Sequence, residues 1–271
     1  MITLDEAQKY LSEFRENPDY TLLRACVISS VRAGNKIARR DFSISSRKKS
    51  DRFLGHHVIV TEADKMSRNI ILPLVPKNAF FIEEEYLIEE DVNKPYRNRM
   101  LNGNNYHQHI NKLVVGIDSL DGTAQYAGDL YEWTIAIGAM RDRRHLVGSV
   151  YAPEIKDGVL FFSVDEDGAY FVNRRRLQRA TVADDKLMKD WMVHYGVEMH
   201  HPEYNKFMNV LDKNARNTNS CGSCALSLGL VATDRIDVSV REPQRVWDWF
   251  AGYPIVEEAG GKMQFYLIKN G

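Results

Sequence analysis

Hydrophobic and polar residues along this chain form two kinds of pattern, a helical repeat and short apolar runs. Leu23, Val27 and Val31 recur at every fourth position, the spacing that places side chains on one face of a helix, so residues 20–38 are predicted to be helical. Related patterns predict helices at residues 4–14, 64–75, 202–211, 225–233 and 247–259. Pro73 interrupts the pattern at 64–75, and Gly260 closes the last helix.

Short apolar runs between these helices are typical of strands. They lie at residues 79–82, 113–117, 133–140, 146–151, 159–162, 169–172, 191–195 and 236–240. Gly148, Gly158 and Gly168 are interpreted as turn residues between the middle strands. Two polar stretches are predicted to lack regular structure, a basic loop at 39–55 and an Asn-rich excursion at 92–111. Helices that alternate with strands, around a run of consecutive strands, predict stacked α and β layers.

The composition excludes several classes of protein. Of 271 residues, 44% are hydrophobic and 27% charged, and the net charge is −1, so no overall attraction to nucleic acid or membranes is expected. No apolar run reaches the roughly 18 residues of a membrane span, and the first residues lack the basic-then-apolar order of a secretory signal. Three cysteines do not form a disulfide scaffold. We therefore expect a cytoplasmic protein that binds neither nucleic acid nor membrane.

Acidic residues gather at three places where chemistry is expected. They are residues 83–85 and 118–123, which each follow a strand, and Asp248, at a helix start. Asp118 and Asp121 are close enough for a turn to aim both carboxylates at one point, and Gly122 allows a tight turn. Converging carboxylates repel unless a proton or cation lies between them, and oxygen ligands suit Mg²⁺, Mn²⁺ or Ca²⁺. Alternatively these acids form turns and cap helices, and the residues alone leave both interpretations open.

Four short motifs resemble those of the inositol monophosphatase family of metal-dependent phosphatases. Asp-Ser-Leu-Asp-Gly-Thr at 118–123 is similar to the family pattern Asp-Pro-(Ile/Leu)-Asp-Gly-Thr. Trp-Asp at 247–248 is followed by Gly252 and by Glu-Ala-Gly-Gly at 258–261. Glu-Glu-Glu at 83–85 approximates Gly-Glu-Glu, and Thr-Glu-Ala-Asp at 61–64 matches Thr-x-x-Asp before a helix. The resemblance implies an α/β layered fold, an α/β/α/β/α sandwich of the inositol monophosphatase and fructose-1,6-bisphosphatase type.

The resemblance also implies a metal site. Glu84, Asp118 and the backbone carbonyl of Leu120 would hold one Mg²⁺ ion. Asp118, Asp121 and Asp248 would hold a second, Mn²⁺ could replace Mg²⁺, and a third, weaker ion could bind near Glu84. One ion would activate a water molecule, and the other would stabilise the leaving oxygen.

Neighbouring groups would handle the proton and the substrate. Glu84 and Thr123 would orient the attacking water, with Asp64 behind Thr123. The backbone N–H groups of Gly122 and Thr123 would hold phosphate oxygens, and those near Cys224 would touch the substrate. The expected activity is Mg²⁺-dependent hydrolysis of inositol monophosphate or a related small sugar phosphate.

Several positions depart from the family pattern. Ser119 replaces Pro, which loosens the turn, and Glu83 replaces Gly, which either adds a negative charge near the ions or points to solvent. Arg241 stands where inositol phosphatases have an acid that contacts sugar hydroxyls, with Glu242 adjacent. A one-residue shift could restore the acid, or Arg241 could face the substrate, which makes fructose 1,6-bisphosphate an alternative, or it could form a structural salt bridge at the surface. Ala-Gln-Tyr at 124–126, in place of Lys-Glu-Phe, counts against a further alternative, 3′-phosphoadenosine 5′-phosphate.

By this resemblance the chain is one domain, residues 1–271, with an α+β part at about 1–180 and an α/β part at about 181–271. It ends soon after Gly261, where relatives continue, so this second part is expected to be truncated or reduced. Family members are often lithium-sensitive homodimers, and we expect the same here. Two alternatives stay open: a catalytically weak relative that acts in binding or regulation, and a redox pair formed by Cys221 and Cys224.

Overall fold

The structure is a computed structural model that describes most of the chain. The described residues are 1–40, 46–50, 57–83, 99–101, 106–109, 111–183, 185–197, 202–242 and 244–266, with the backbone alone at 46–50, 57–60 and 107. Within these ranges, no helix combines the length and the apolar character needed to cross a membrane.

The larger of the main sheets has eight strands. They are β3 (Phe80–Glu83), β4 (Met100–Leu101), β5 (Val114–Asp121), β6 (Thr134–Arg141), β7 (Arg144–Ala152), β8 (Val159–Val164), β9 (Gly168–Asn173) and β10 (Arg176–Arg179). Their order in space is β10-β9-β8-β7-β6-β5-β3-β4. Strand β3 runs parallel to β4 and β5, and the remaining neighbours are antiparallel. Strand β5 is buried along its whole length, as its apolar run predicts.

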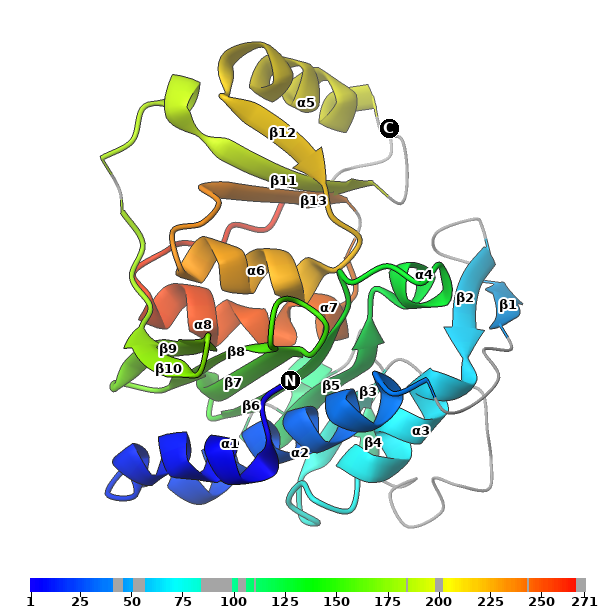
Figure 1. Ribbon diagram of the computed structural model, residues 1–271, viewed down its shortest axis with the longest axis vertical. Coiled ribbons are helices and arrows are strands. Elements are labelled where there is room, and N and C mark those ends of the chain that lie inside the picture. The colour runs from blue at the N-terminus through cyan, green and yellow to red at the C-terminus, as the bar shows by residue number, and fades with distance from the viewer. Residues whose placement is uncertain are drawn as a thin grey trace.

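Helices cover both faces of this sheet. One face carries α1 (Leu4–Leu11), α2 (Tyr20–Ile37) and α3 (Glu62–Ile71), and the other carries α6 (Cys224–Ala232), α7 (Val246–Phe250) and α8 (Gly252–Glu258), as Figure 1 shows. The predicted apolar face of α2 is confirmed, because Leu23, Val27 and Val31 are fully buried in the core between this helix and the sheet. A second core, which includes Phe161 and Ile255, lies between the sheet and the other helices.

A smaller, three-stranded sheet lies beyond α6. Its central strand, β11 (Met192–Val197), pairs in parallel with β12 (Asn217–Ser220) and β13 (Val238–Glu242). Helix α5 (Pro202–Asn214) covers its outer face through a small core built around Val193 and Tyr204. The order of layers is therefore helices, sheet, helices, sheet and helix, which confirms the expected α/β/α/β/α sandwich (Figure 1).

The structure corrects three local predictions. Part of the expected loop at 39–55 forms β1 (Ser46–Ser50), which pairs antiparallel with β2 (His57–Thr61). This pairing provides hydrogen-bond partners for backbone N–H and C=O groups, which the polar side chains of the stretch do not predict. The excursion at 92–111 contributes β4 and a short 3₁₀ helix at Tyr106–His109. The helix predicted at 247–259 is two helices, α7 and α8. Pro254, which lacks a backbone N–H, fits only within the first turn of the second helix.

Gly148 is not the turn residue that the sequence predicted. It lies within β7 opposite Gly138 of β6, which is followed across the sheet by Gly116 of β5. A Cβ atom on Gly148 would overlap the carbonyl oxygen of Ala251, and a Cβ atom on Gly138 would lie 2.9 Å from the Cα of Ala251. These glycines therefore let the junction of α7 and α8 pack directly on the backbone of the sheet.

Candidate active site

The acidic turn, residues 118–123, ends β5 and leads into the short helix α4 (Thr123–Ala127). Asp118 and Asp121 are almost completely buried, and the pairing of β5 with β6 shifts register between them. The Asp118 carboxylate accepts a backbone N–H from two residues further on, at 3.1 Å, which fixes the turn locally. Gly122 has a left-handed φ of 89°, and a Cβ there would lie 2.9 Å from a backbone carbonyl oxygen. The turn therefore requires glycine at this position.

Thr123, at the start of α4, lies beside Asp64 of α3. Its Oγ1 is 3.1 Å from Asp64 Oδ1 and 2.9 Å from the Leu120 carbonyl oxygen, so the hydroxyl can donate to either. Asp64 Oδ2 accepts the backbone N–H of Thr61 at 2.7 Å and the hydroxyl of Thr61 at 2.6 Å, in a capping box that begins α3. Burial raises the pKa of Asp64, while these hydrogen bonds act against the rise. The Thr-x-x-Asp motif is thus in contact with the acidic turn.

The carboxylate of Asp121 is held by the N-terminus of α6. Its Oδ2 accepts the Ser223 hydroxyl and the Ala225 N–H, both at 2.6 Å, and its Oδ1 accepts the Cys224 N–H at 3.2 Å. Thr134 Oγ1 also lies 3.3 Å from Oδ2. Burial raises the pKa of Asp121, and the hydrogen bonds from α6 oppose the rise. This acid therefore links the acidic turn to a helix more than a hundred residues away along the chain.

Asp248 and Cys224 complete this neighbourhood. Asp248 caps α7, since its Oδ2 accepts the Arg245 N–H at 2.6 Å. The Cys224 thiol is buried, and its pKa is raised well above the ordinary value, first by burial and further by the charges of Asp121, Asp248 and Asp118. These three acids, from two separate segments, therefore lie within electrostatic reach of one buried thiol.

Arg241 and Glu242, the two residues expected to face the substrate, lie at the end of β13. Arg241 Nη2 donates to the Ser223 carbonyl oxygen at 2.7 Å and to the Ser227 hydroxyl at 2.6 Å. Glu242 is buried. The Arg241 guanidinium therefore points at the first turn of α6, and contact of either residue with a substrate stays a prediction.

One predicted residue, Glu84, lies outside the described residues. Its neighbour Glu83 is the last residue of β3, is buried, and has its Oε1 3.5 Å from the Ser119 hydroxyl. Glu83 and Ser119, which both depart from the family pattern, therefore lie side by side. Sequence reasoning missed Thr134 and Ser223 as partners of the acidic turn, although a serine just before a predicted helix is a common N-cap.

The donor atoms around the acidic turn suit a hard divalent cation. Asp118, Asp121, Asp248 and the Leu120 carbonyl offer oxygens, and its raised pKa keeps the Cys224 thiol protonated, which disfavours soft metals that need a thiolate. Within the described ranges, no three His, Cys, Asp or Glu side chains already converge as a metal site. The carboxylates of Asp121 and Asp248 instead accept backbone hydrogen bonds.

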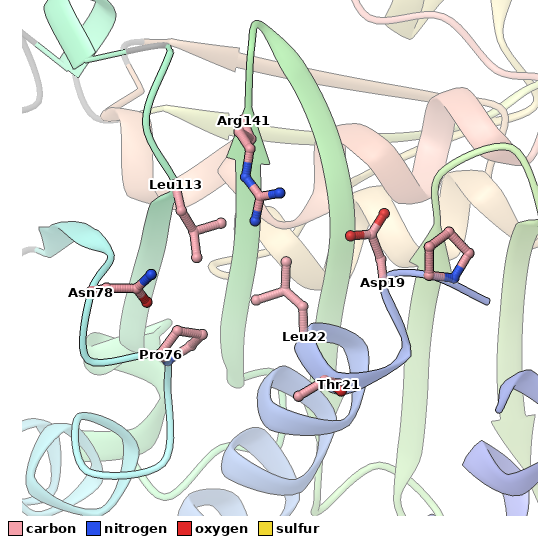
Figure 2. A pocket seen from close by; sticks show the side chains of 8 residues that line it. Asp19, Thr21, Leu22, Pro76, Asn78, Leu113 and Arg141 are labelled. Carbon is pink, nitrogen blue, oxygen red and sulfur yellow. The ribbon is translucent and has the colours of Figure 1, made fainter. Parts of the chain in front are cut away.

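A shallow cavity of about 270 Å³ lies at the opposite end of the same strands (Figure 2). Its lining includes Leu113, just before β5, and Arg141, the last residue of β6, together with Asp19 and Leu22 at the start of α2. Because the acidic turn is at the other end of β5, this cavity is separate from the candidate active site.

Comparison with known proteins identifies the family of this chain. A sequence model of the inositol monophosphatase family matches residues 19–266. The chain is 30% identical to the Nus factor SuhB of Haemophilus influenzae, over 89% of this chain and 83% of that protein. It is 25% identical to the fructose-1,6-bisphosphatase/inositol-1-monophosphatase of Thermotoga maritima, over 80% and 75% of the two chains. The solved inositol monophosphatase from Anabaena superposes with a TM-score of 0.66 and 25% identity, over 89% and 82% of the two chains.

Proposed function

Because this chain belongs to the inositol monophosphatase family, whose phosphatases generally use divalent metals, we propose that it hydrolyses a small phosphate monoester with Mg²⁺. One observation carries the proposal. The acidic turn contains two buried carboxylates, Asp118 and Asp121, and ends at Thr123, whose hydroxyl is 3.1 Å from a third carboxylate, Asp64. Such a set can hold a cation and manage a proton at the same point.

The metal ligands would come from three segments of the chain. Glu84, Asp118 and the Leu120 carbonyl would hold one ion, and Asp118, Asp121 and Asp248 a second, with Mn²⁺ as a substitute. When bound, the ions would lower the pKa of a water molecule and stabilise negative charge on the leaving oxygen. Asp118 belongs to both sets, so its loss should disable the whole centre.

The protein groups around the ions would orient the water and the phosphate. When Thr123 donates its hydroxyl hydrogen to Asp64, its oxygen can accept a hydrogen bond from the attacking water, and Glu84 would take the water proton. The backbone N–H groups of Gly122 and Thr123 would bind phosphate oxygens, because the first N–H groups of a helix lack partners within that helix.

The alcohol half of the substrate would lie toward α6 and β13. There the N–H beside Cys224 and the side chain of Glu242 are the proposed contacts. The names of the relatives include both inositol-1-monophosphatase and fructose-1,6-bisphosphatase. We therefore propose inositol monophosphate or a related sugar phosphate as substrate, with fructose 1,6-bisphosphate as the alternative.

A substrate panel with and without Mg²⁺ tests this function. Inositol 1-phosphate, fructose 1,6-bisphosphate and 3′-phosphoadenosine 5′-phosphate would be compared by phosphate release, and Li⁺ should inhibit. Asp118→Asn should lower kcat on the order of a thousandfold, whereas Asp185→Asn, at an exposed position, should change it less than about twofold. Metal-dependent activity that survives in Asp118→Asn would overturn the proposed site.

We also expect a homodimer in the cytoplasm. Size-exclusion chromatography with light scattering would measure the mass of the particle in solution. A monomer that retains full activity would show that the site needs no partner subunit.

A second candidate function is binding or regulation with little catalysis. The carboxylate of Asp121 already accepts hydrogen bonds on both oxygens, and one relative carries the name Nus factor SuhB. If no member of the panel releases phosphate with Mg²⁺ or Mn²⁺, this function is favoured instead.

A further inference from the structure

A chain of polar contacts links β13 to the first turn of α6. Arg241 Nη2 donates to the Ser223 carbonyl oxygen at 2.7 Å and to the Ser227 hydroxyl at 2.6 Å. Ser227 Oγ in turn lies 3.2 Å from the same Ser223 carbonyl oxygen. Ser223 is therefore fixed through its backbone by a residue of β13.

The side chain of Ser223 connects this network to the acidic turn. Its hydroxyl donates to Asp121 Oδ2 at 2.6 Å and accepts the Leu226 N–H at 3.1 Å. Because the bond from Ser223 to Asp121 is short and completely buried, a shift of Ser223 has to move the carboxylate or break the bond.

The smaller sheet leaves room for this arrangement. Arg241 lies opposite Gly196 of β11, and a Cβ atom on Gly196 would overlap Nη1 of Arg241. The guanidinium therefore lies across the backbone of the neighbouring strand, with Nη2 held by two acceptors on α6. A lysine could make only part of this planar, forked contact.

We propose that Arg241 is a positioning residue, which aims the Asp121 carboxylate through Ser223 instead of binding the substrate itself. This role rests on the proposed metal-dependent function of the acidic turn. It predicts that loss of Arg241 weakens the binding of the metal more than the binding of the substrate.

Isothermal titration of the substrate-free protein with Mg²⁺ tests the role, alongside the Mg²⁺ dependence and KM of phosphate release. Arg241→Gln should weaken Mg²⁺ binding about tenfold and leave KM within about twofold. Arg241→Lys should recover part of the loss, and Ser227→Ala should weaken binding about threefold. Arg216→Gln is the matched control, since this arginine lies in the same part of the chain but pairs on the surface with Asp190.

A raised KM with unchanged Mg²⁺ binding in Arg241→Gln would overturn the proposal and assign Arg241 to the substrate. If Arg241→Gln does not fold, Ser227→Ala and Arg241→Lys decide in the same way.

If the wild-type protein binds no Mg²⁺, the proposed function fails. The coupling of Arg241 to Asp121 is then measured from the melting temperatures of Arg241→Gln, Asp121→Asn and the double variant. Additive shifts would contradict the positioning role, and a smaller combined shift would support it.

Discussion

The two main sheets contact the helices between them in opposite ways. The eight-stranded sheet meets α7 and α8 through glycines, so that the carbonyl of Ala251 lies directly on Gly148 of β7. The three-stranded sheet meets α6 through side chains, chiefly Arg241 and its bonds to Ser223 and Ser227. A contact between two backbones cannot adjust to an added atom, whereas a long side chain can change rotamer.

This difference bears directly on the acidic turn, because both aspartates belong to β5 of the larger sheet but the side chain of Asp121 also contacts α6. The Asp118 carboxylate is fixed within the larger sheet and its turn, because it accepts the backbone N–H of Leu120. Asp121 is held by α6, which is itself held by Arg241 of the other sheet. We infer that the larger sheet determines the stability of the protein, and that the smaller sheet adjusts the geometry of the site.

Gly148→Ala should have the largest effect on stability. Its Cβ would overlap the carbonyl oxygen of Ala251 and lie 2.9 Å from side-chain atoms of Pro254 and Ile255. We expect the free energy of unfolding to fall by about 3 kcal/mol or more, measured by urea denaturation. Gly260→Ala is the control, because its φ is 88° but no atom lies within 4 Å of the added carbon. It should cost about 1 kcal/mol, and equal losses in both variants would contradict a rigid contact.

A fall in pH should weaken the contact of α7 and α8 with the larger sheet, because it favours protonation of His145 on β7. Burial against the rings of Phe250 and Tyr253 lowers the pKa of His145 from 6.5 to about 4. The folded protein therefore favours the neutral ring, and the stability that this preference contributes is complete above pH 6.5 and is lost as the pH falls toward 4. Between pH 7 and 4.5, the wild type should lose about 2–3 kcal/mol more unfolding free energy than His145→Leu. Identical pH dependence in the two proteins would rule out this histidine as the cause.

Gly196→Ala probes the smaller sheet in the way that Gly148→Ala probes the larger one. The added Cβ would overlap the end of the Arg241 side chain, which can move aside. Stability should therefore fall by less than about 1 kcal/mol, while Mg²⁺ binding should weaken severalfold. A loss of stability as large as that of Gly148→Ala would mean that both sheets are equally rigid.

The smallest expected effect is a change in the pKa of His194 on β11. This histidine is partly buried in the smaller sheet, as His145 is in the larger one. Its Nδ1 lies 3.3 Å from the Ser227 hydroxyl, and its pKa is lowered first by burial and then by the charge of Arg241. Arg241→Gln should therefore raise the pKa of His194, as measured by NMR titration, and leave that of His145 unchanged. A shift at both histidines would indicate a general loosening of the protein.

Much of the fold and part of the site follow from short-range patterns. The spacing of Leu23, Val27 and Val31 predicted a buried helical face, because side chains four residues apart always lie on the same side of a helix. The turn from Asp118 to Thr123 is likewise local, with its glycine at a left-handed φ. The boundary between α7 and α8 was missed, although Pro254 signalled it, because a proline in the interior of one helix over 247–259 would remove a helical hydrogen bond.

The chain sequence by itself determined most of the helices and central strands, the acidic turn and the family to which the protein belongs. Only the tertiary structure decided that Gly148 accommodates a helix junction instead of a turn, and that Arg241 points at Ser223. Both outcomes depend on atoms from segments distant in the sequence, whose approach is set by the packing of whole layers. The spacing of neighbouring residues does not predict which distant segments come into contact. The partners of Asp121 could therefore be identified only in the folded chain.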